Sequence, residues 1–220
     1  MIRAVTHSET GGHAHNEDAF ILRSHPDDPA SYLCAVADGQ GGQSVGGPAA
    51  RLACDTFLKV ASQATLAELM VFGVWDDILA FVDRTVAADA LAGFTTLVAF
   101  CIAGGFLRGA SSGDSALILA EPEQEPLILT ARQSKDPPVG SGGAVFVPFS
   151  IKPQAPWTAL AMTDGVWKYV GWDTLLQAAA GAPPEEMLRS LRQRAGLPGS
   201  GTLQDDFTVI ILYGQVAGGL

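Results

Sequence analysis

The sequence has no apolar run long enough to cross a membrane. Its longest such stretch, residues 97–107, contains Gly104 and Gly105 and falls short of the roughly 18 residues that a spanning helix needs. The first residues, MIRAVTHSETGG, lack the apolar core of a secretion signal. We therefore expect a cytoplasmic protein that does not contact a membrane.

Cysteine is scarce and histidine is confined to one region. Cys34, Cys54 and Cys101 are widely spaced among apolar neighbours, which argues against a disulfide framework and predicts reduced core thiols. The four histidines lie within residues 1–25 and lack the H-E-x-x-H spacing of zinc hydrolases. The motifs G-x-x-x-x-G-K-[ST] and G-x-S-x-G are absent as well. Zinc, P-loop and serine-hydrolase chemistry are therefore disfavoured.

Basic residues are few, with 13 Lys and Arg against 23 Asp and Glu and a net charge of −10 at pH 7. This balance argues against a nucleic-acid partner. What the sequence does have is 48% hydrophobic residues and 16% charged residues, which is typical of a globular protein with a sizeable core. We predict a single domain over residues 1–220, and we expect a monomer.

Strand-like runs outnumber helical segments. Strands are predicted over residues 2–5, 19–23, 32–37, 95–103, 106–110, 115–120, 126–130, 144–151, 157–163 and 207–213. Helical spacing covers residues 48–62, 66–91 (with a break at Gly73) and 184–195. Because two helices are inserted together, rather than one after each strand, the order favours an α+β fold. We expect antiparallel sheets with helices on their outer faces.

Acidic residues mark the ends of four predicted strands. Two strands end on Asp-Gly pairs, in SYLCAVADGQGG and TALAMTDG, and two begin after acidic pairs, in HNEDAFIL and QDDFTVIIL. Each Asp-Gly pair alone is a turn signal. However, sheets bring strand ends together, and crowded carboxylates repel one another unless cations neutralise them. Oxygen ligands without Cys or paired His suit magnesium or manganese, so a hard-cation site is predicted.

Six motifs, read in order, resemble those of the PP2C (PPM) metal-dependent protein phosphatases, in their compact bacterial form. They are NEDAF (16–20), VADGQGG (36–42), FTTLVAF (94–100), GDSALIL (113–119), MTDGVW (162–167) and DDFTVII (205–211). The resemblance implies a sandwich of two antiparallel β-sheets flanked by α-helices. It also implies hydrolysis of phosphoserine and phosphothreonine in phosphorylated proteins, the products of Ser/Thr kinases.

The resemblance further implies a centre of two Mn²⁺ or Mg²⁺ ions at one end of the sandwich. In this pattern Asp38 bridges both ions, the Gly39 carbonyl completes one, and Asp164 and Asp205 hold the other. Two ions of this kind activate a water and neutralise the phosphoryl oxygens. The adjacent residues have supporting roles: coordinated waters are bound or oriented by Glu17 and Asp18, and a structural role falls to Asp206.

Two further positions bear on the metal count and on substrate binding. Asp114, in GDS, matches a residue that helps to hold a third ion in bacterial members, and a turn explains it equally well. His13 stands where the family usually has an arginine that grips the substrate phosphate. Because histidine is mostly neutral at pH 7.5 and donates fewer hydrogen bonds, we expect a weak, pH-dependent grip, unless His13 is a solvated loop residue.

This sequence also departs from the family pattern at two further places, just after Asp38 and after residue 130. Gln40 follows the first Asp-Gly pair, and the segment ARQSKDPPVGSGG is short where the family has a flap over the site. These differences leave the metal carboxylates intact and affect substrate binding. Two alternatives therefore stay open: a catalytically weak, phosphatase-like module that recognises a phosphoprotein, and a hydrolase of small phosphoesters.

Overall fold

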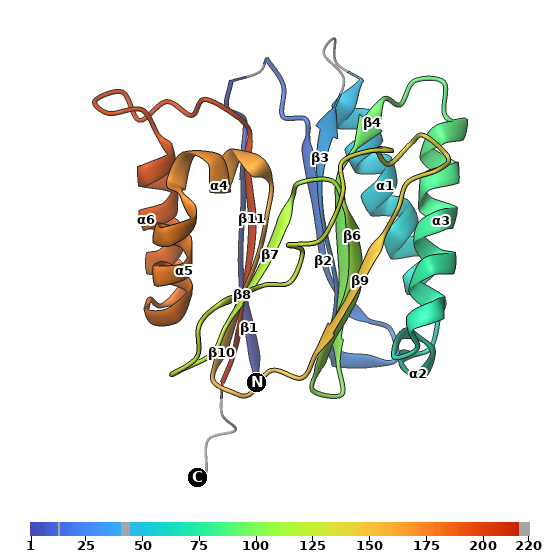
Figure 1. Cartoon of the computed structure of the whole chain (residues 1–220), viewed down its shortest axis with the longest axis horizontal. Coiled ribbons are helices and arrows are strands. Elements are labelled where there is room, and N and C mark those ends of the chain that lie inside the picture. The colour runs from blue at the N-terminus through green and yellow to red at the C-terminus, as the bar shows by residue number, and fades with distance from the viewer. Residues whose placement is uncertain (13, 41–44, 216–220) are drawn as a thin grey trace.

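Two antiparallel β-sheets face each other in the computed structural model, which describes residues 1–12, 14–40 and 45–215 (Figure 1). The first sheet joins, in this order, β1 (Ile2–Glu9), β11 (Phe207–Gly214), β10 (Trp157–Met162), β7 (Ala116–Ala120) and β8 (Leu127–Ile128). The second sheet joins β2 (Asp18–His25), β3 (Asp28–Gln40), β5 (Leu97–Ala103), β6 (Phe106–Ser112) and β9 (Val147–Ile151). The short β4 (Phe94–Thr95) pairs with β3. The predicted α+β class and the antiparallel sandwich are confirmed.

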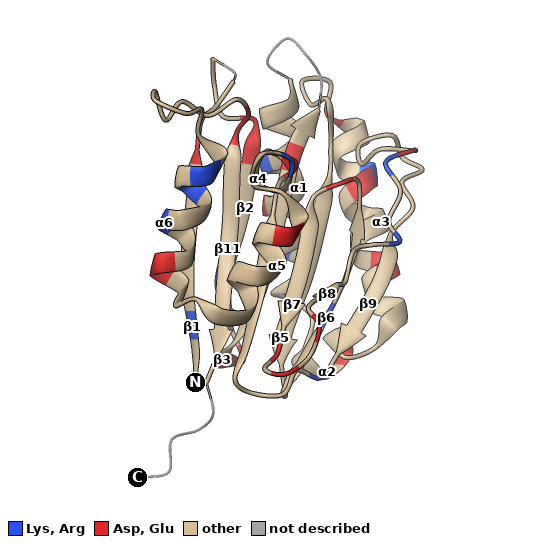
Figure 2. Cartoon of the chain, turned by 60° about the vertical axis from the view of Figure 1, so that its left-hand side comes forward, with Lys and Arg blue, Asp and Glu red and all other residues tan. Residues whose placement is uncertain are grey.

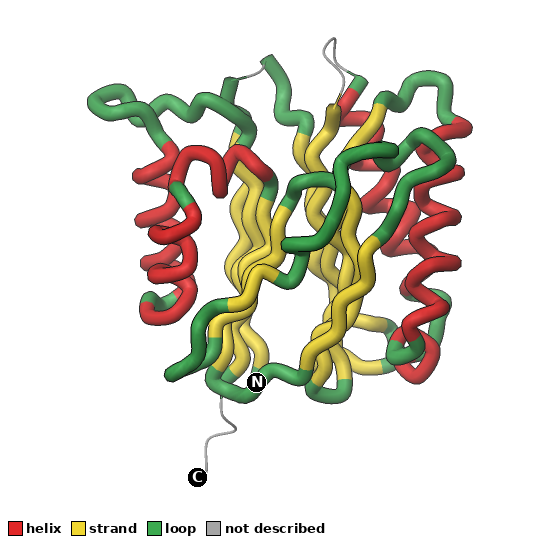
Figure 3. The backbone as a smooth tube through the Cα atoms, viewed as in Figure 1, coloured by secondary structure: helices red, strands yellow, loops and turns green. Residues whose placement is uncertain are grey.

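Helices cover both outer faces of the sandwich (Figures 1 and 3). The second sheet carries α1 (Gly46–Ala61), α2 (Leu66–Leu69) and α3 (Phe72–Ala88). The first sheet carries α4 (Asp164–Val170), α5 (Trp172–Gly181) and α6 (Pro184–Ala195). The helix predicted over residues 184–195 is confirmed. The expected break in the second helical region falls between Leu69 and Phe72 instead of at Gly73.

The central strands alternate between two cores with a period of two residues. In β11, Val209 and Ile211 pack toward the helices, whereas Ile210 and Leu212 pack toward the other sheet. The same alternation separates neighbouring residues of β3 and β5 into the helix-side core and the core between the sheets. Because both faces of these strands are buried, their sequences are nearly continuous apolar runs.

Sequence reasoning missed α4 and α5. The Asp-Gly pair at Asp164 is a turn signal when taken alone, but Asp164 is the first residue of α4. The two helices are short and are separated by Gly171, whose φ of 85° places it in the left-handed region that favours glycine. Because α4 has only seven residues and ends at this glycine, its apolar residues show little helical periodicity. In α5 the buried residues Leu175 and Ala179 lie one turn apart, but the helix is too short for this spacing to stand out.

Three predicted strands also have different limits. The strand expected over residues 126–130 is reduced to β8, and the strand expected over residues 144–151 begins only at Val147. The strand expected over residues 32–37 is longer, because β3 runs through Asp38 and Gly39 to Gln40. The first Asp-Gly pair is therefore part of a paired strand and not a turn.

The three cysteines are buried and free, as the sequence predicts. Cys34 lies in the core between the sheets, while Cys54 and Cys101 lie in the core beneath α1 and α3. In the part of the chain that the structure describes, no helix combines the length and the apolar character that crossing a membrane requires.

Candidate metal centre

Strand register brings the acidic strand ends to one end of the sandwich. In the antiparallel pair β2–β3, Asp18 lies directly opposite Asp38. In the other sheet, Met162 at the end of β10 lies between Ala116 of β7 and Val209 of β11. Residues just beyond these strand ends must therefore meet, and Figure 2 shows acidic segments at the upper ends of the central strands.

Three carboxyl groups converge between the two sheets. Asp38, Asp114 and Asp164 each offer an oxygen, and the three oxygens lie within 4.8 Å of one another. Asp38 comes from β3 of the second sheet, whereas Asp114 precedes β7 and Asp164 follows β10 in the first. The side chains of Asp114 and Asp164 are only 12% and 11% exposed. We call these three residues the carboxylate cluster.

The other predicted site residues lie around this cluster or outside the described residues. Asp18 is buried opposite Asp38, and Asp205 packs beside Gly165, next to Asp164. The backbone carbonyl of Glu17 accepts a hydrogen bond of 3.2 Å from the Gly39 N–H. His13 lies outside the described residues. The group of oxygens within 4.8 Å does not include Glu17, Asp18 or Asp205, and all of these ligand assignments stay predictions.

Glycine at position 39 is required by a close approach between backbones. A Cβ atom at Gly39 would overlap the backbone of Gly46 at the start of α1, and it would lie 2.7 Å from the carbonyl oxygen of Glu17. A Cβ at Gly46 would in turn meet the Gly39 carbonyl at 2.6 Å. The glycines therefore let β3, carrying Asp38, run directly against the N-terminus of α1.

Buried hydroxyl groups connect the two sheets beneath the carboxylates. Thr163, between β10 and α4, donates a 2.8 Å hydrogen bond from Oγ1 to Oδ2 of Asp18 in the other sheet. Thr96 Oγ1 accepts a 2.9 Å hydrogen bond from the Asp38 N–H and shares a 2.6 Å hydrogen bond with Ser115 Oγ, across the sandwich. Sequence reasoning missed these residues. The sequence feature that could have revealed them is a Thr or Ser inside or beside an otherwise apolar strand.

Asp206 holds the segment that leads into β2. Its Oδ1 accepts a hydrogen bond from the Gly11 N–H and its Oδ2 accepts one from the Glu17 N–H, each at 2.7 Å. The residue is only 3% exposed. These contacts are those of a structural residue, as expected for Asp206, because they fix the position of Glu17 and Asp18 relative to β11.

Burial and mutual repulsion raise the pKa of the carboxyl groups from the second sheet. For Asp38, burial and the neighbouring Asp18, Asp164 and Asp114 raise the pKa to about 9. For Asp18, burial raises the pKa to about 7, although hydrogen bonds from Thr163 and a second threonine oppose the shift. Asp38 also shares a hydrogen bond with Asp164. In the absence of a cation, Asp38 therefore retains a proton at neutral pH.

Two lysines contact the carboxylates of the first sheet. The ammonium group of Lys168, one helical turn after Asp164 in α4, donates to Oδ2 of Asp164. The ammonium group of Lys135, from the segment after β8, forms an ion pair with Oδ2 of Asp114. Burial raises the pKa of Asp114 and Lys135 opposes that shift. Of these two lysines, only Lys168 could be linked to its partner from the sequence, because it lies four residues after Asp164 and the two side chains meet once both are in a helix.

The donor atoms of this centre fit a hard divalent cation. All the side-chain donors of the carboxylate cluster are oxygens, and they come from both sheets. Both carboxylate oxygens of Asp114 are buried without accepting a hydrogen bond of good geometry, although the Lys135 ammonium contacts one of them. The Lys135 ammonium supplies one positive charge at this carboxylate, and a divalent cation would supply further partners for its buried oxygens. The residues present can therefore hold magnesium or manganese.

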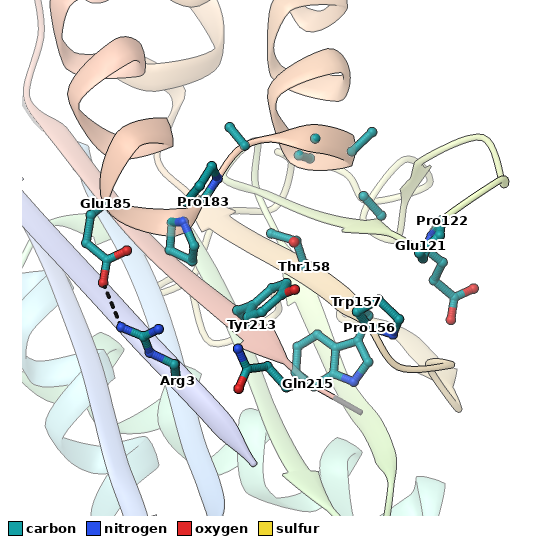
Figure 4. A pocket seen from close by; sticks show the side chains of 16 residues that line it. Arg3, Glu121, Pro122, Pro156, Trp157, Thr158, Pro183, Glu185, Tyr213 and Gln215 are labelled. Carbon is teal, nitrogen blue, oxygen red and sulfur yellow. Dashed lines mark hydrogen bonds and ion pairs between the residues drawn. The ribbon is translucent and has the colours of Figure 1, made fainter. Parts of the chain in front are cut away.

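Of two hollows in the surface, one lies beside the carboxylate cluster and the other lies far from it. A cleft of about 460 Å³ lies beside Asp114 and is lined by Gln133, Lys135, Trp167 and Trp172, among others. A second hollow of about 360 Å³ lies at the opposite end of the first sheet, where Arg3 pairs with Glu185 (Figure 4). Its lining includes none of the predicted site residues. Of these two hollows, the first borders the carboxylate cluster and the second does not.

Comparison with known proteins supports this interpretation of the fold. The profile of the Stage II sporulation protein E (SpoIIE) family matches residues 28–214. No curated protein sequence gives a significant match to the chain.

Several solved structures have the same fold. The catalytic domain of the serine/threonine protein phosphatase PstP, in complex with two manganese ions, is 22% identical with a TM-score of 0.80, covering 98% of this chain and 99% of that one. PppA, a regulatory component of the T6SS in Pseudomonas aeruginosa, is 21% identical with a TM-score of 0.76 and 96% coverage of both chains. RsbX in complex with magnesium is 18% identical with a TM-score of 0.73, covering 96% of this chain and 94% of that one.

Proposed function

The chain belongs to the SpoIIE family and has a PP2C-like fold, and we propose that it hydrolyses phosphoserine and phosphothreonine in proteins with the help of Mn²⁺ or Mg²⁺. The observation that carries this proposal is the carboxylate cluster, in which oxygens from both sheets lie within 4.8 Å of one another at one end of the sandwich. The solved structures of PstP with two manganese ions and of RsbX with magnesium support the proposal, because these proteins share the fold and bind such ions.

In this proposal the strand ends hold two ions. Asp38 would be a ligand of both, the Gly39 carbonyl would help to hold one, and Asp164 and Asp205 would hold the other. When bound, such ions activate a water for attack on phosphorus and neutralise the phosphoryl oxygens. The rigid strands and the hydroxyl contacts of Thr96 and Thr163 keep the carboxylates in place.

Substrate recognition in this proposal involves His13 and the cleft beside Asp114. We assign His13 to the phosphate group on the sequence pattern alone. Glu17 and Asp18 would orient waters on the ions, and Asp114 falls at the position that the sequence pattern associates with a third ion. The proposed substrate is a phosphorylated protein, which the cleft beside Asp114 would receive through its partly polar wall of Gln133 and Lys135.

The test is hydrolysis of a phosphothreonine peptide and of a generic aryl phosphate, with and without manganese. We expect turnover with manganese or magnesium, loss of turnover after EDTA treatment, and no effect of a phenanthroline-type zinc chelator, because the proposed ligands are all oxygens. Full activity in metal-free protein would contradict the mechanism. Activity on the aryl phosphate alone would favour the small-phosphoester alternative.

One observation favours the second candidate, a binding module with little turnover. Lysines already contact two of the three carboxylates in the cluster and compete there with metal ions. A module of this kind would bind the phosphothreonine peptide more tightly than its unphosphorylated form, without hydrolysing it at saturating manganese. Calorimetry with the two peptides, beside the turnover assay, separates the candidates.

A further inference from the structure

Lys168 is directed into the carboxylate cluster by its position in α4. The helix begins at Asp164, so Lys168 lies one turn later on the same face, where i,i+4 side chains meet. Its ammonium group donates to Oδ2 of Asp164, a member of the carboxylate cluster. The Lys168 side chain is 41% exposed, so a metal-dependent rearrangement would not have to move it through the core.

Lys135 reaches the cluster because its segment pairs with the residues on both sides of Asp114. The Gly113 N–H donates a 2.8 Å hydrogen bond to the Ser134 carbonyl. On the other side, Gln133 Nε2 donates to the Ser115 carbonyl at 2.5 Å. Residues 133–135 therefore run alongside residues 113–115, and the Lys135 ammonium meets the Asp114 carboxylate between the two hydrogen bonds.

A second anchor fixes the far part of this segment. The carboxylate of Asp83 in α3 is only 3% exposed and accepts hydrogen bonds from three backbone N–H groups. These come from Gly140 at 2.7 Å, Gly142 at 3.2 Å and Ala144 at 3.0 Å. The segment between β8 and β9 is thus tied down at both ends, which places the backbone of residue 135 beside Asp114.

We propose that Lys135 and Lys168 are resident counterions, whose ammonium groups occupy the edge of the cluster formed by Asp114 and Asp164 in place of a further divalent ion. This inference rests on the proposed metal centre. Two ammonium groups on two carboxylates satisfy the charge that would otherwise attract a cation there. This edge of the site then needs no further divalent ion. Because Lys168 contacts Oδ2 of Asp164, the Oδ1 atom of Asp164 can still serve, with Asp38 and Asp205, as a ligand for the two ions of the proposed centre.

The experiment measures manganese binding rather than activity. The full chain and its Lys135→Met/Lys168→Met variant are stripped of metal, and bound Mn²⁺ per chain is determined by equilibrium dialysis with elemental analysis. We expect the variant to bind one more ion per chain, or the same number about tenfold more tightly, which is about 1.4 kcal/mol. The metal-free variant should melt at a lower temperature than the metal-free unmodified chain, and saturating manganese should abolish this difference.

Matched variants separate charge from packing. Lys168→Arg retains the positive charge and should bind manganese as the unmodified chain does. Lys59→Met removes an exposed lysine of α1 and should change neither binding nor melting. If the double variant does not fold, Lys135→Met alone, at a side chain that is 52% exposed, provides the same comparison.

Superimposable manganese curves for the unmodified chain and the lysine variants would overturn the inference, as would an unchanged melting temperature of the metal-free double variant. This failure differs from failure of the proposed function. Superimposable curves together with peptide turnover would reject the counterions and leave the phosphatase intact. A gain of manganese in the variants, with no turnover by the unmodified chain, would support the counterions and reject the phosphatase.

Discussion

The two sheets balance the charge of their carboxylates in different ways. Asp18 and Asp38, from β2 and β3, have no lysine among the ion pairs of the described residues, and burial raises the pKa of both. Asp114 and Asp164, from the opposite sheet, each contact a lysine. We call the first pair the protonated half and the second pair the lysine half.

The difference shows how one acidic site can be stable without a bound ion. In the protonated half, metal ions compete with protons, so binding depends on pH. In the lysine half, metal ions compete with tethered ammonium groups, so binding depends on the lysines and on salt. A carboxylate cluster therefore does not have to unfold when its metal is removed, and the loss of stability should be smaller than four unbalanced carboxylates would produce.

The largest effect is expected at Asp38, which belongs to the protonated half and also hydrogen-bonds to Asp164. Asp38→Asn should reduce turnover by roughly a thousandfold or more, because the loss of a bridging carboxylate removes several kcal/mol of transition-state stabilisation. Asp164→Asn should have a similar effect, and Asp76→Asn, at an exposed position in α3, should have none. Residual turnover within tenfold of the unmodified chain would show that Asp38 does not hold the ions.

The adjacent residues Asp205 and Asp206 should separate activity from stability. Asp205→Ala should lower turnover more than Asp206→Ala, because only Asp205 falls at the ligand position of the motif. Asp206→Ala leaves the N–H groups of Gly11 and Glu17 without their acceptor and should lower the free energy of unfolding by roughly 3 kcal/mol. Turnover and chemical denaturation of both variants measure this contrast. The reverse order of turnover would mean that the motif is aligned one residue off.

The pH dependence of the metal-free protein tests the protonated half. The folded chain holds a proton on Asp38 up to a pKa of about 9, whereas the unfolded chain releases it near the ordinary value of 3.8. The folded state therefore binds more protons within this window, and stability should fall as pH rises from about 5 to 9. The groups that face Asp38 are the carboxylates of Asp18, Asp114 and Asp164, the last two with their lysines.

Thermal midpoints across this pH range provide the measurement. Asp38→Asn cannot titrate at this position and should flatten the decline, which makes it the matched control. Saturating manganese should reverse the slope in the unmodified chain, because the ions bind the deprotonated form. The same decline in the unmodified chain and in Asp38→Asn would assign the pH dependence to other groups.

The sequence predicts the protonated half better than the lysine half. Asp18 and Asp38 are recognisable because each lies at the acidic end of an apolar run, and the two runs are adjacent in the chain and pair in register. Asp164 was recognised as a candidate metal ligand after an apolar strand, but the sequence did not predict that helix α4 begins there. Asp114 stayed open between a ligand and a turn, because its place depends on which sheet β7 joins. Sheet order in a sandwich is set by long-range packing, which local patterns do not encode.

The lysines and hydroxyls were missed for a related reason. Lys135 reaches Asp114 only through the pairing of residues 133–135 with residues 113–115, a contact without any periodic signal. Thr96 and Ser115 lie in the motifs that indicated the family, yet their hydrogen bond crosses from one sheet to the other. Strand patterns show which face a residue occupies and cannot show its partner across a sandwich. Contacts between sheets therefore required the structure.

The smallest effects are expected where hydroxyl groups join the two halves. Thr163→Val removes the donor to Asp18 and the acceptor of the Thr208 N–H, and it should lower the free energy of unfolding by about 2 kcal/mol. Thr96→Val removes one acceptor and the hydrogen bond to Ser115, and the expected loss is similar. Because these bonds position both halves, each variant should also lower manganese affinity by about tenfold, the size of effect typical of residues that orient metal ligands.

Serine at the same positions separates hydrogen bonding from shape. Thr163→Ser and Thr96→Ser keep the hydroxyl and lose only a methyl group, so they should retain most of the manganese affinity that the valine variants lose. Thr85→Val is the control, since its hydroxyl donates to the Phe81 carbonyl on the surface of α3, away from the carboxylates. If both valine variants bound manganese as the unmodified chain does, the hydroxyls would stabilise the sandwich without positioning its carboxylates. The strands themselves would then set the position of the protonated half relative to the lysine half.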